Sequence, residues 1–464
     1  MKPGLADSAR RIAPLAWPVL VGQLSVLAFS TVDTVLVARY AAADLASLAV
    51  GGAAYITTFI GFMGIVVAIS PIAGQLFGAG QHAQAGRQLH QAVWVALALS
   101  VLGSTVLLFP APFLALSRAG PDVADKVRGY LTALALSLPA SLLFTAFRGF
   151  NTAVSRPKAV MALQVAGLAL KLPLSAALVF GVPALGVPSL GVLGCGMATC
   201  VSMWAQALGA FWLLRHDAFY APFAITGRRL DAPDRKALWV QLKLGVPMGA
   251  SILVEVSGFA FMAIFISRLG TVPVAGHQIA ANLVSVLFMV PLAIANASGA
   301  LVAQRVGAKD LRDARRVGWH GLQLGLAIAT LMGAATFFGR ERIVGWYAQD
   351  PAVVAAALPL LAWVALFHVA DAGQTISAFV LRAYRIATVP LLINAAALWG
   401  VGLGGGYLLA FGLPDAAGPL LGARGFWLAA TGGLVLTALG LVMFLGWVLR
   451  QQLPRGPVPV QPAH

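Results

Sequence analysis

The sequence predicts an all-α integral membrane protein whose chain crosses the bilayer twelve times. Of its 464 residues, 60% are hydrophobic and only 10% are charged, whereas a soluble globular protein carries about 25% charged residues. Apolar runs recur from Leu15 to Leu449, and a spanning helix needs about 20 mostly apolar residues. Twelve helices of about 23 residues leave only short loops, which excludes a large catalytic domain outside the membrane.

Glycine, proline and charged residues separate the apolar segments from one another. The first segment follows Arg10 and Arg11. It is too long for the core of a signal peptide and ends without a small-residue cleavage pattern, so we interpret it as a retained helix. The twelve predicted spans, in chain order, are residues 14–38, 46–72, 89–112, 129–150, 159–182, 190–214, 241–267, 273–301, 318–338, 352–380, 386–411 and 425–449.

The longest loop divides the spans into two groups of six. It covers residues 215–240 and is rich in charged side chains. The sequence therefore predicts a first lobe over residues 1–214, a cytoplasmic linker over 215–240 and a second lobe over 241–449. The proline-rich segment 450–464 cannot continue a helix, and we expect it to be a disordered cytoplasmic tail.

The basic residues indicate how the chain is oriented. With the N-terminus inside, 22 Lys and Arg residues fall on the cytoplasmic side and 8 on the outer side, which is a clear positive-inside signal. An even number of spans places both termini in the cytoplasm. The net charge of +16 then follows from the cytoplasmic loops, so it does not indicate nucleic-acid binding.

The two halves of the chain are related by a shift of 229 residues. Leu15 falls on Leu244 and Pro18 falls on Pro247. The segment Gln75-x-x-Gly78-Ala79 falls on Gln304-x-x-Gly307-Ala308. Because each half holds six spans, the repeats are parallel, and transporters built in this way bind substrate between the halves. The alternative is that two unrelated six-span halves share similar loops.

Three acids lie inside the predicted spans, Asp33, Glu255 and Asp371, and Lys171 is the only cation well inside one. A charge at the centre of a spanning helix costs about 2.5–3.5 kcal/mol on insertion scales and usually marks an ion or substrate path. The alternative is a structural charge near a helix end, which fits Asp33 best. Glu255 and Asp371 lie deep in their spans.

Polar and aromatic neighbours of the acids suggest a cation site. Phe367, Asp371 and Gln374 share one helix face, and an aromatic ring beside an acid suits an organic cation. Gln278 and Asn282 are four residues apart and can donate hydrogen bonds to a buried acid. Two chemistries remain open. A buried acid can exchange its proton for an arriving cation, or two acids with amide oxygens can hold Na⁺.

Motifs of other function classes are missing from the sequence. No G-x-x-x-x-G-K-[ST] segment supports ATP-driven pumping, and no His-Glu-x-x-His segment supports a zinc enzyme. Cys195 and Cys200 point to different faces of a helix, so we expect neither a disulfide nor a metal site. We interpret His277 and His368 as helix-contact residues. These observations favour a transporter over an enzyme.

Several segments resemble the MATE family of multidrug and toxin exporters, in its NorM-like branch. In the first half the resemblance rests on Leu15-Ala16-x-Pro18, Val32-Asp33-Thr34, Pro71-Ile72-Ala73-x-Gln75 and Gly78-Ala79-Gly80. In the second half it rests on Gly276-His277-Gln278-Ile279-Ala280-Ala281-Asn282, Phe288-Met289-Val290-Pro291-Leu292, Val306-Gly307-Ala308-Lys309-Asp310, Phe367-x-x-x-Asp371-x-x-Gln374 and Leu381-Arg382-Ala383-Tyr384.

The resemblance implies two six-helix lobes around a central cavity. It also implies a secondary-active exporter in the bacterial inner membrane that releases amphipathic organic cations in exchange for Na⁺ or H⁺, with no other cofactor. We expect a monomer surrounded by lipid.

The resemblance also assigns roles to residues. Glu255 and Asp371 match the coupling acids, and they would be the metal ligands if the ion is Na⁺. Asp33 matches the first-lobe acid. The expected cavity residues are Phe367, Gln278, Asn282, Gln374 and Lys171, and the expected kink positions are Pro18 and Pro247.

Two departures from the family pattern bear on mechanism. Ala383 follows Leu381-Arg382 where the family often has glycine, and Lys171 stands where the family often has asparagine. Lys171 could pair with Asp33 and hold it ionised. The runner-up function is a flippase for lipid-linked precursors, which would need several cavity cations to meet phosphate groups. The three intramembrane acids disfavour it.

Overall fold

The structure, a computed structural model, describes residues 4–117, 120–225, 230–412 and 421–451. Its helices are α1 (Leu5–Tyr40), α2 (Ala42–Val66), α3 (Ile69–Gly78), α4 (His82–Leu108), α5 (Ala111–Ser117), α6 (Pro121–Ala153), α7 (Pro157–Phe180), η1 (Pro183–Leu185), α8 (Val192–His216), η2 (Ala218–Phe223), α9 (Arg235–Ser267), α10 (Thr271–Gly307), α11 (Leu311–Tyr347), α12 (Pro351–Ala383), α13 (Thr388–Asn394), η3 (Ala395–Gly404), α14 (Gly405–Phe411) and α15 (Gly422–Gln451). Within these ranges, twelve helical segments are long and apolar enough to span a membrane, which confirms the predicted number. The predicted tail lies almost entirely outside the described residues.

The helices are longer than the predicted spans because polar caps extend them past the apolar segments. α11 covers Leu311–Tyr347, whereas the sequence predicts only residues 318–338. The carboxylates of Asp234 and Asp350 each accept a hydrogen bond from a backbone N–H in the first turn of the helix that follows, at 2.9 Å. Such caps satisfy N–H groups that have no partner within the helix.

Two of the membrane-spanning segments are not continuous α-helices. The second is interrupted at Val67 and Ala68, between α2 and α3. The eleventh runs through α13, the π-helical stretch η3 and α14. Glycines recur in that stretch, and π-helical turns are frequent at functional sites. Irregular backbone at this depth is tolerated where neighbouring helices bury it.

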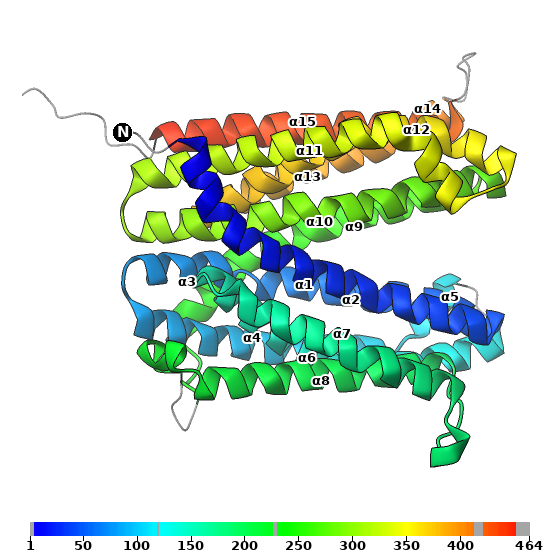
Figure 1. Cartoon of the computed structure of the whole chain (residues 1–464), viewed down its shortest axis with the longest axis horizontal. Helices are drawn as coiled ribbons and strands as arrows, with labels where there is room; N and C mark the ends of the chain where they lie inside the picture. The colour runs from blue at the N-terminus through cyan, green and yellow to red at the C-terminus, as the bar shows by residue number, and fades with distance from the viewer. Residues whose placement is uncertain (1–3, 118–119, 226–229, 413–420, 452–464) are drawn as a thin grey trace, which may run out of the picture.

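The helices form two lobes that lie side by side (Figure 1), as predicted, with α1 running between them. Near its start, Ile12 and Ala16 pack into the core of the second lobe. Further along, α1 packs against α7 of the first lobe. The first turns of α1, which the sequence assigns to the first lobe, thus pack into the core of the second lobe.

Polar contacts attach the start of α1 to α11. The guanidinium of Arg11 forms an ion pair with Asp313 at 3.0 Å. The Ser8 hydroxyl and Nδ1 of His320 lie 2.7 Å apart. Pro18 lies inside α1 without breaking it, and Pro247 likewise lies inside α9. The structure therefore places both expected kink residues within continuous helices.

The linker packs against the first lobe. The side chains of Tyr220 and Phe223 in η2 are buried, and they join the first-lobe core. Further on, Nδ1 of His90 lies 3.0 Å from the Asp231 carboxylate, and Gln91 donates to the backbone carbonyl of Ala232 at 3.0 Å. Apart from residues 226–229, which are not described, the linker is thus a packed extension of the first lobe.

The lobes meet at one end through backbone contacts that follow the 229-residue repeat. A Cβ atom on Gly78 would lie 1.8 Å from the Gln304 carbonyl oxygen, and one on Gly307 would lie 1.8 Å from that of Gln75. Nε2 of Gln75 donates to the Ala383 carbonyl, and Nε2 of Gln304 donates to the Ala153 carbonyl, both at 2.7 Å. Equivalent residues of the two repeats thus contact each other reciprocally. We call this contact, formed around Gln75, Gly78, Gln304 and Gly307, the seam.

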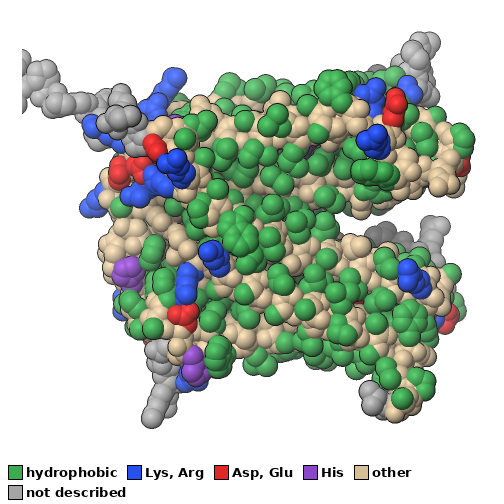
Figure 2. Space-filling view, viewed as in Figure 1, with side chains coloured by type: hydrophobic (Ala, Val, Ile, Leu, Met, Phe, Trp, Pro, Cys, Tyr) green, Lys and Arg blue, Asp and Glu red, His purple; other side chains and the backbone are tan. Residues whose placement is uncertain are grey.

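The seam closes the end of the molecule at which the described chain begins and ends (Figure 1). At the opposite end the surface is hollowed between the lobes (Figure 2). Lys and Arg side chains gather mainly over the closed end in this view. By the positive-inside rule, the cleft opens away from the side predicted to be cytoplasmic.

Candidate functional site

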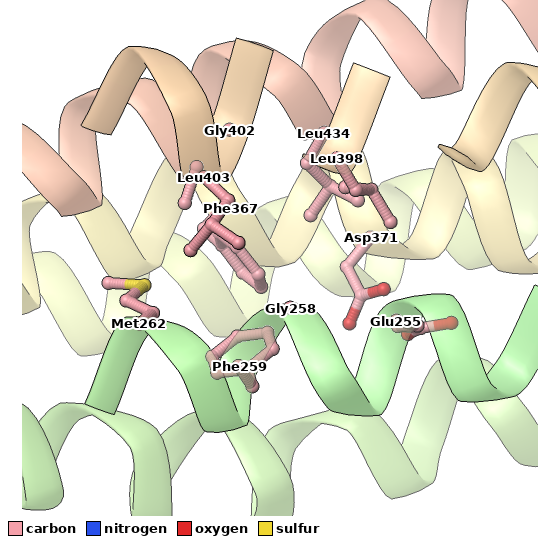
Figure 3. A pocket seen from close by; sticks show the side chains of 11 residues that line it. Glu255, Gly258, Phe259, Met262, Phe367, Asp371, Leu398, Gly402, Leu403 and Leu434 are labelled. Atoms are coloured by element: carbon pink, nitrogen blue, oxygen red, sulfur yellow. The ribbon is translucent and has the colours of Figure 1, made fainter. Parts of the chain in front are cut away.

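α9 and α12 carry the two second-lobe acids into one small pocket. Asp371 projects from α12 toward α9, on which Glu255 lies (Figure 3). Asp371 is only 4% exposed. The pocket lining consists of Glu255, Gly258, Phe259, Met262, Phe367, Asp371, Leu398, Gly402, Leu403, Ala430 and Leu434. On α9 the lining residues recur at intervals of three or four, which places them on one face of the helix.

The pocket has room for an ion and a few waters. Its volume is ≈ 50 Å³, whereas one water needs about 10–15 Å³ on this measure. Sites for drug-sized ligands occupy about 300–1,000 Å³. In this conformation the acids therefore line a space suited to a small cation, and a drug-sized molecule does not fit beside them.

Aromatic side chains enclose the outer part of this pocket. The ring of Phe367 packs edge-on against Phe259, with centroids 5.6 Å apart, and against Trp427 at 5.8 Å. Phe367 is only 3% exposed. It lines the same pocket as Asp371, and its ring is covered by the neighbouring rings.

Polar groups of α12 lie on the other side of the acids. The amide of Gln374 lies near both Glu255 and Asp371 and interacts favourably with their charged forms. The Thr375 hydroxyl donates to Oδ1 of Asp371 at 3.5 Å. Within the described part of the chain, neither acid has a Lys, Arg or His nitrogen within 4 Å. Neither carboxyl group therefore forms an ion pair there, although the buried Arg382 is near enough to attract Glu255.

Arg382 is a residue that the sequence analysis placed wrongly. We expected it in a cytoplasmic loop, because the apolar pattern ends near residue 380. Instead α12 continues to Ala383, and the Arg382 side chain is buried in its last turn. Its guanidinium lies over the Phe379 ring at 4.7 Å and attracts Glu255 electrostatically. The family-like motif Leu381-Arg382-Ala383-Tyr384 was the sequence feature that could have singled out Arg382.

Gln278 and Asn282 do not bond the acids. Both side chains are exposed on α10, and Oδ1 of Asn282 accepts a hydrogen bond from the Tyr347 hydroxyl at 2.9 Å. No hydrogen bond from either residue to Glu255 or Asp371 occurs in the described ranges. The prediction that they donate to a buried acid is therefore wrong. Their spacing of four residues predicts that they share a helix face, but it does not predict which neighbouring helix that face contacts.

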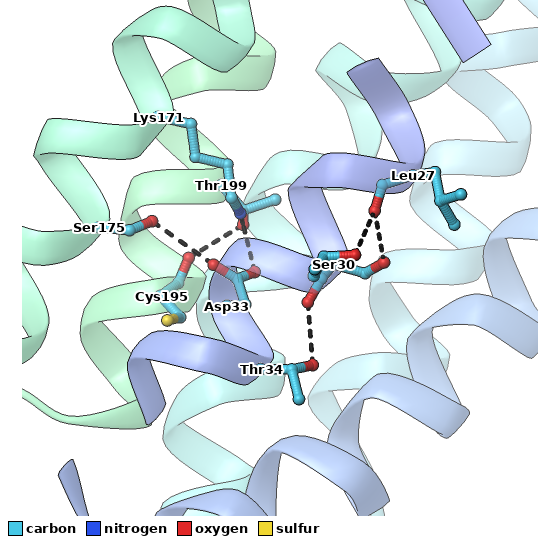
Figure 4. Close-up of polar contacts among 9 residues, drawn as sticks. Leu27, Ser30, Asp33, Thr34, Lys171, Ser175, Cys195 and Thr199 are labelled. Carbon is cyan, nitrogen blue, oxygen red and sulfur yellow. Dashed lines mark hydrogen bonds and ion pairs between the residues drawn. The ribbon is translucent and has the colours of Figure 1, made fainter. Parts of the chain in front are cut away.

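The first lobe holds its acid in an ion pair. Nζ of Lys171 donates to Oδ2 of Asp33 at 2.8 Å and also to the Thr199 hydroxyl (Figure 4). The Ser175 hydroxyl donates to Oδ1 of Asp33 at 3.5 Å. Lys171 is only 1% exposed and Asp33 6%, and the ammonium lies 4.9 Å from the centroid of the Phe29 ring. The pairing that the sequence left open is present.

The two lobes therefore differ in charge although their sequences repeat at a shift of 229 residues. The first-lobe acid is neutralised by a tethered ammonium, whereas the second-lobe acids share a pocket without one. Cys195 and Cys200 are free thiols. No cluster of three or more His, Cys, Asp or Glu residues suited to a metal occurs among the residues described. His277 packs against Trp427, with ring centroids 5.9 Å apart.

A family model described as MatE matches this chain twice, over residues 18–177 and 247–408. The chain belongs to the MatE family. The two matches begin 229 residues apart, which is the shift found within the sequence. The MatE fold thus consists here of two copies of one unit, and the seam residues Gln75 and Gln304 occupy corresponding places in the two copies.

Curated relatives match this MatE chain over nearly its full length. A "Probable multidrug resistance protein NorM" of Aromatoleum aromaticum is 40% identical over 452 residues, covering 96% of this chain and 95% of the relative. "Multidrug resistance protein MdtK" of Yersinia pseudotuberculosis is 32% identical over 447 residues, covering 96% of each. The predicted family and branch are confirmed.

Solved structures share the fold. The crystal structure of the eukaryotic MATE transporter AtDTX14 superposes with a TM-score of 0.84 at 19% identity, covering 97% of this chain and 99% of that one. The Vibrio cholerae MATE transporter VcmN in its bent form gives 0.84 at 18% identity, covering 97% and 98%. The chain is thus a multi-pass membrane protein with the two-lobed MatE architecture.

Proposed function

We propose that this chain is a multidrug efflux transporter that exports amphipathic organic cations in exchange for Na⁺ or H⁺. The observation that supports the coupling mechanism is the pair Glu255 and Asp371, which line an ion-sized pocket of the second lobe and form no ion pair within 4 Å in the described chain. The nearly full-length relatives named as multidrug resistance proteins support the drug substrate. The runner-up flippase is not favoured, because the ammonium of Lys171 is already bound to Asp33.

The two spaces in the molecule suit two different ligands. A pocket of ≈ 50 Å³ suits the coupling ion, whereas the cleft between the lobes (Figure 2) suits a drug-sized cation. Gln278 and Asn282, exposed on α10, are available to a substrate in the cleft. Phe367 then acts by shaping the ion pocket, with Gln374 as the amide that links the two acids.

The coupling acids can act in either of the two ways that the sequence left open. Carboxylate oxygens are ligands for Na⁺, and the Gln374 amide and Thr375 hydroxyl would add neutral oxygens to Glu255 and Asp371. Alternatively, the same carboxyl groups would carry protons. In both cases the incoming ion neutralises the carboxylates of the second lobe. The outgoing organic cation is released when these carboxylates are neutralised.

Asp33 plays a structural part in this proposal. Because Lys171 supplies its counter-charge from within the lobe, Asp33 does not need a mobile ion to neutralise it. We place the protein in the bacterial inner membrane with both termini cytoplasmic, as a monomer among lipids. The distribution of Lys and Arg (Figure 2) supports this orientation.

Transport in proteoliposomes tests the proposal. Efflux of a cationic dye would be driven separately by an imposed Na⁺ gradient and an imposed pH gradient, for the wild type and for Asp371→Asn. We expect one gradient to drive the wild type and the variant to be inactive. If neither gradient moves the dye, or if anionic dyes move and cationic dyes do not, the proposed function is wrong.

A further inference from the structure

A third space lies on the surface of the second lobe, in a groove between α11 and α12. Its volume is ≈ 340 Å³, which falls within the range of about 300–1,000 Å³ typical of sites for small molecules. None of its lining residues belongs to the acid pocket, so the two sites are separate. The residues that line the groove are Phe337, Arg340, Glu341, Leu358, Pro359 and Ala362.

The inner end of the groove is closed by a close contact between its two helices. A Cβ atom on Gly333 of α11 would lie 2.8 Å from the Ala365 carbonyl oxygen of α12. Gly333 precedes Phe337 by four residues, and Ala365 follows Ala362 by three, so this contact lies one turn from the lining residues. Because α11 begins beside the seam, the groove extends from this contact toward the opposite end of the molecule.

The side chains around the groove place it at the level of the lipid headgroups. Phe338 is 83% exposed, and Leu366 across the groove is 50% exposed, as expected where helices face hydrocarbon. Further along α11, Trp346 is 76% exposed, and exposed tryptophan is typical of the membrane interface. Arg340 and Glu341 lie between Phe338 and Trp346, and therefore where hydrocarbon gives way to headgroups. In the predicted orientation this is the outer half of the bilayer.

Two opposite charges line the groove without neutralising each other. The Arg340 guanidinium donates to the Phe337 carbonyl of its own helix at 2.6 Å and lies 4.6 Å from the centroid of the Phe337 ring. These contacts hold it in place and leave further N–H donors free. Among the described residues Arg340 forms no ion pair, and Glu341 forms neither an ion pair nor a hydrogen bond. Both charges are therefore available to a ligand.

The chemistry of the groove matches a zwitterion with one apolar end. Guanidinium groups bind phosphate through charge-assisted hydrogen bonds, and carboxylates accept such bonds from ammonium groups. Successive residues of a helix differ by about 1.5 Å in depth, so Arg340 and Glu341 present their charges side by side. Phe337 and Ala362 supply an apolar surface one turn deeper. A ligand with a phosphate, a nearby ammonium and an acyl chain satisfies all of these groups.

We propose that the groove between α11 and α12 binds phosphatidylethanolamine. Arg340 binds the phosphate, Glu341 accepts a hydrogen bond from the primary ammonium, and an acyl chain lies against Phe337 and Ala362. Phosphatidylcholine binds less well because its quaternary nitrogen has no N–H to donate. Phosphatidylglycerol binds less well because it brings a negative charge to Glu341 and no ammonium. The site is separate from those of the drug and the coupling ion.

Lipid binding to the purified full-length protein in detergent tests the site. Native mass spectrometry would follow titrations with the three phospholipids, all with the same acyl chains. We expect phosphatidylethanolamine to bind most tightly. Hydrogen bonds to charged groups are the strong ones, so Arg340→Gln should weaken its binding by about tenfold or more. Glu341→Gln should remove the preference for phosphatidylethanolamine over phosphatidylcholine, and it should strengthen the binding of phosphatidylglycerol.

Arg342→Gln is the matched control. Arg342 is an exposed neighbour on α11 that does not line the groove, so its loss should leave the order of the three lipids unchanged. Ala362→Phe fills the groove without changing its charge and should weaken the binding of all three lipids. Unfolding temperatures without added lipid check that each variant is folded. If Ala362→Phe does not fold, the surface variants of Arg340 and Glu341 decide the question.

Three results would overturn the proposed lipid site. The first is equal binding of the three lipids by the wild type. The second is an unchanged preference for phosphatidylethanolamine in Glu341→Gln. The third is binding of free phosphoethanolamine as tight as that of the lipid, because the apolar part of the groove would then contribute nothing. All of these measure binding in detergent, so they leave the proposed export function to the dye-efflux experiment.

Discussion

Lys171 and Asp33 form the most deeply buried ion pair of the described chain. Desolvating two charges is costly, and removing one partner of a buried pair leaves the other uncompensated. Thr199 and Ser175 satisfy further hydrogen-bonding capacity of the pair. The pair is therefore a fixed part of the first lobe, and its two members depend on each other.

Lys171→Ala should destabilise the protein by about 3–5 kcal/mol, the range measured for breaking buried pairs. Replacing both partners, as in Lys171→Leu with Asp33→Leu, should recover most of that loss. Thermal unfolding in detergent measures both effects. Lys158→Ala, an exposed lysine on the same helix, is the control and should change stability little.

Lys171→Ala also tests whether the ion pair affects the coupling of transport to protons. Because Lys171 forms an ion pair with Asp33, its removal should leave that carboxyl group without its counter-charge and change the pH dependence of dye transport. An unchanged pH profile in a variant that folds would contradict the role given to the pair.

Asp217 is a capping residue outside the membrane whose ionisation bears on the linker. Its pKa is lowered below the ordinary value, mainly because its carboxylate accepts a hydrogen bond from the Phe219 backbone N–H, and further because of Arg156. The N–H···O distance is 2.9 Å, and the ion pair with Arg156 measures 2.6 Å. A lowered pKa means that the folded protein stabilises the ionised form of the Asp217 carboxyl group more than the unfolded chain does.

The packing of η2 should therefore depend on pH. For a lowered pKa, the stabilisation is present above the pKa of the unfolded chain and is lost as the pH falls through the folded value, which here lies below 3.8. Limited proteolysis of the linker should show protection at pH 7 and increased cleavage by an acid-active protease near pH 3. Asp217→Asn should be cleaved more readily already at pH 7. Equal protection of both proteins at pH 7 would contradict this expectation.

At the scale of helices, small residues permit the close crossings between lobes. A Cβ on Gly64 would lie 2.4 Å from Cα of Gly249, and one on Gly249 would lie 2.5 Å from the Gly61 carbonyl oxygen. α2 and α9 therefore approach with backbone against backbone. Membrane helices use small residues in this way because lipid provides no hydrophobic force to join them. Pro247 lies between Gly245 and Gly249, at the crossing itself.

Gly307→Ala should open the seam at the end of α10. Its added Cβ would lie 1.8 Å from the Gln75 carbonyl oxygen, and a backbone atom cannot move aside as a flexible side chain can. Overpacking of this kind costs about 1–3 kcal/mol. Gly432→Ala on α15 is the control, because nothing lies within 4 Å of its added Cβ. Thermal unfolding of the two variants measures the difference, and equal stability would argue against a tight seam.

At the scale of the whole molecule, the seam sets which end of the cleft is open. Gln75 reaches from the first lobe to the Ala383 carbonyl of the second, and Gln304 reaches back to Ala153 of the first. Gln304 also donates to the Ser155 hydroxyl at 2.8 Å. Rocking of the lobes in transport must break these bonds in each cycle.

Removing both amides should shift the population toward the form open at the seam. Each hydrogen bond contributes about 0.5–1.5 kcal/mol, so the loss of two such bonds in Gln75→Ala with Gln304→Ala should raise the population of that form roughly 5- to 160-fold. Labelling of a cysteine introduced at Ala79, in a background without native cysteines, would report access to the seam. Gln81→Ala, an exposed glutamine beside the same turn, is the control. Equal labelling of all three proteins would contradict the role of the bonds.

Much of this architecture was accessible from the chain alone. The apolar runs determined the number of spans, because a helix in lipid satisfies its backbone hydrogen bonds within the segment itself. The 229-residue shift determined the pairing of Gln75 with Gln304 and of Pro18 with Pro247 as equivalent positions. The acids Glu255 and Asp371 stood out because a charge within an apolar run is costly. These are local properties, so local sequence was sufficient.

The tertiary structure decided how those helices turn and what they touch. Spacing placed Gln278 and Asn282 on one face of α10, but the packing of α10 on α12 turned that face away from the acids. The apolar pattern ended before Arg382, yet helix packing buried it. The contact between Ser251 and Asn394 joins residues 143 positions apart. Such contacts depend on the crossing and rotation of whole helices, and no periodicity within one helix specifies its orientation toward another.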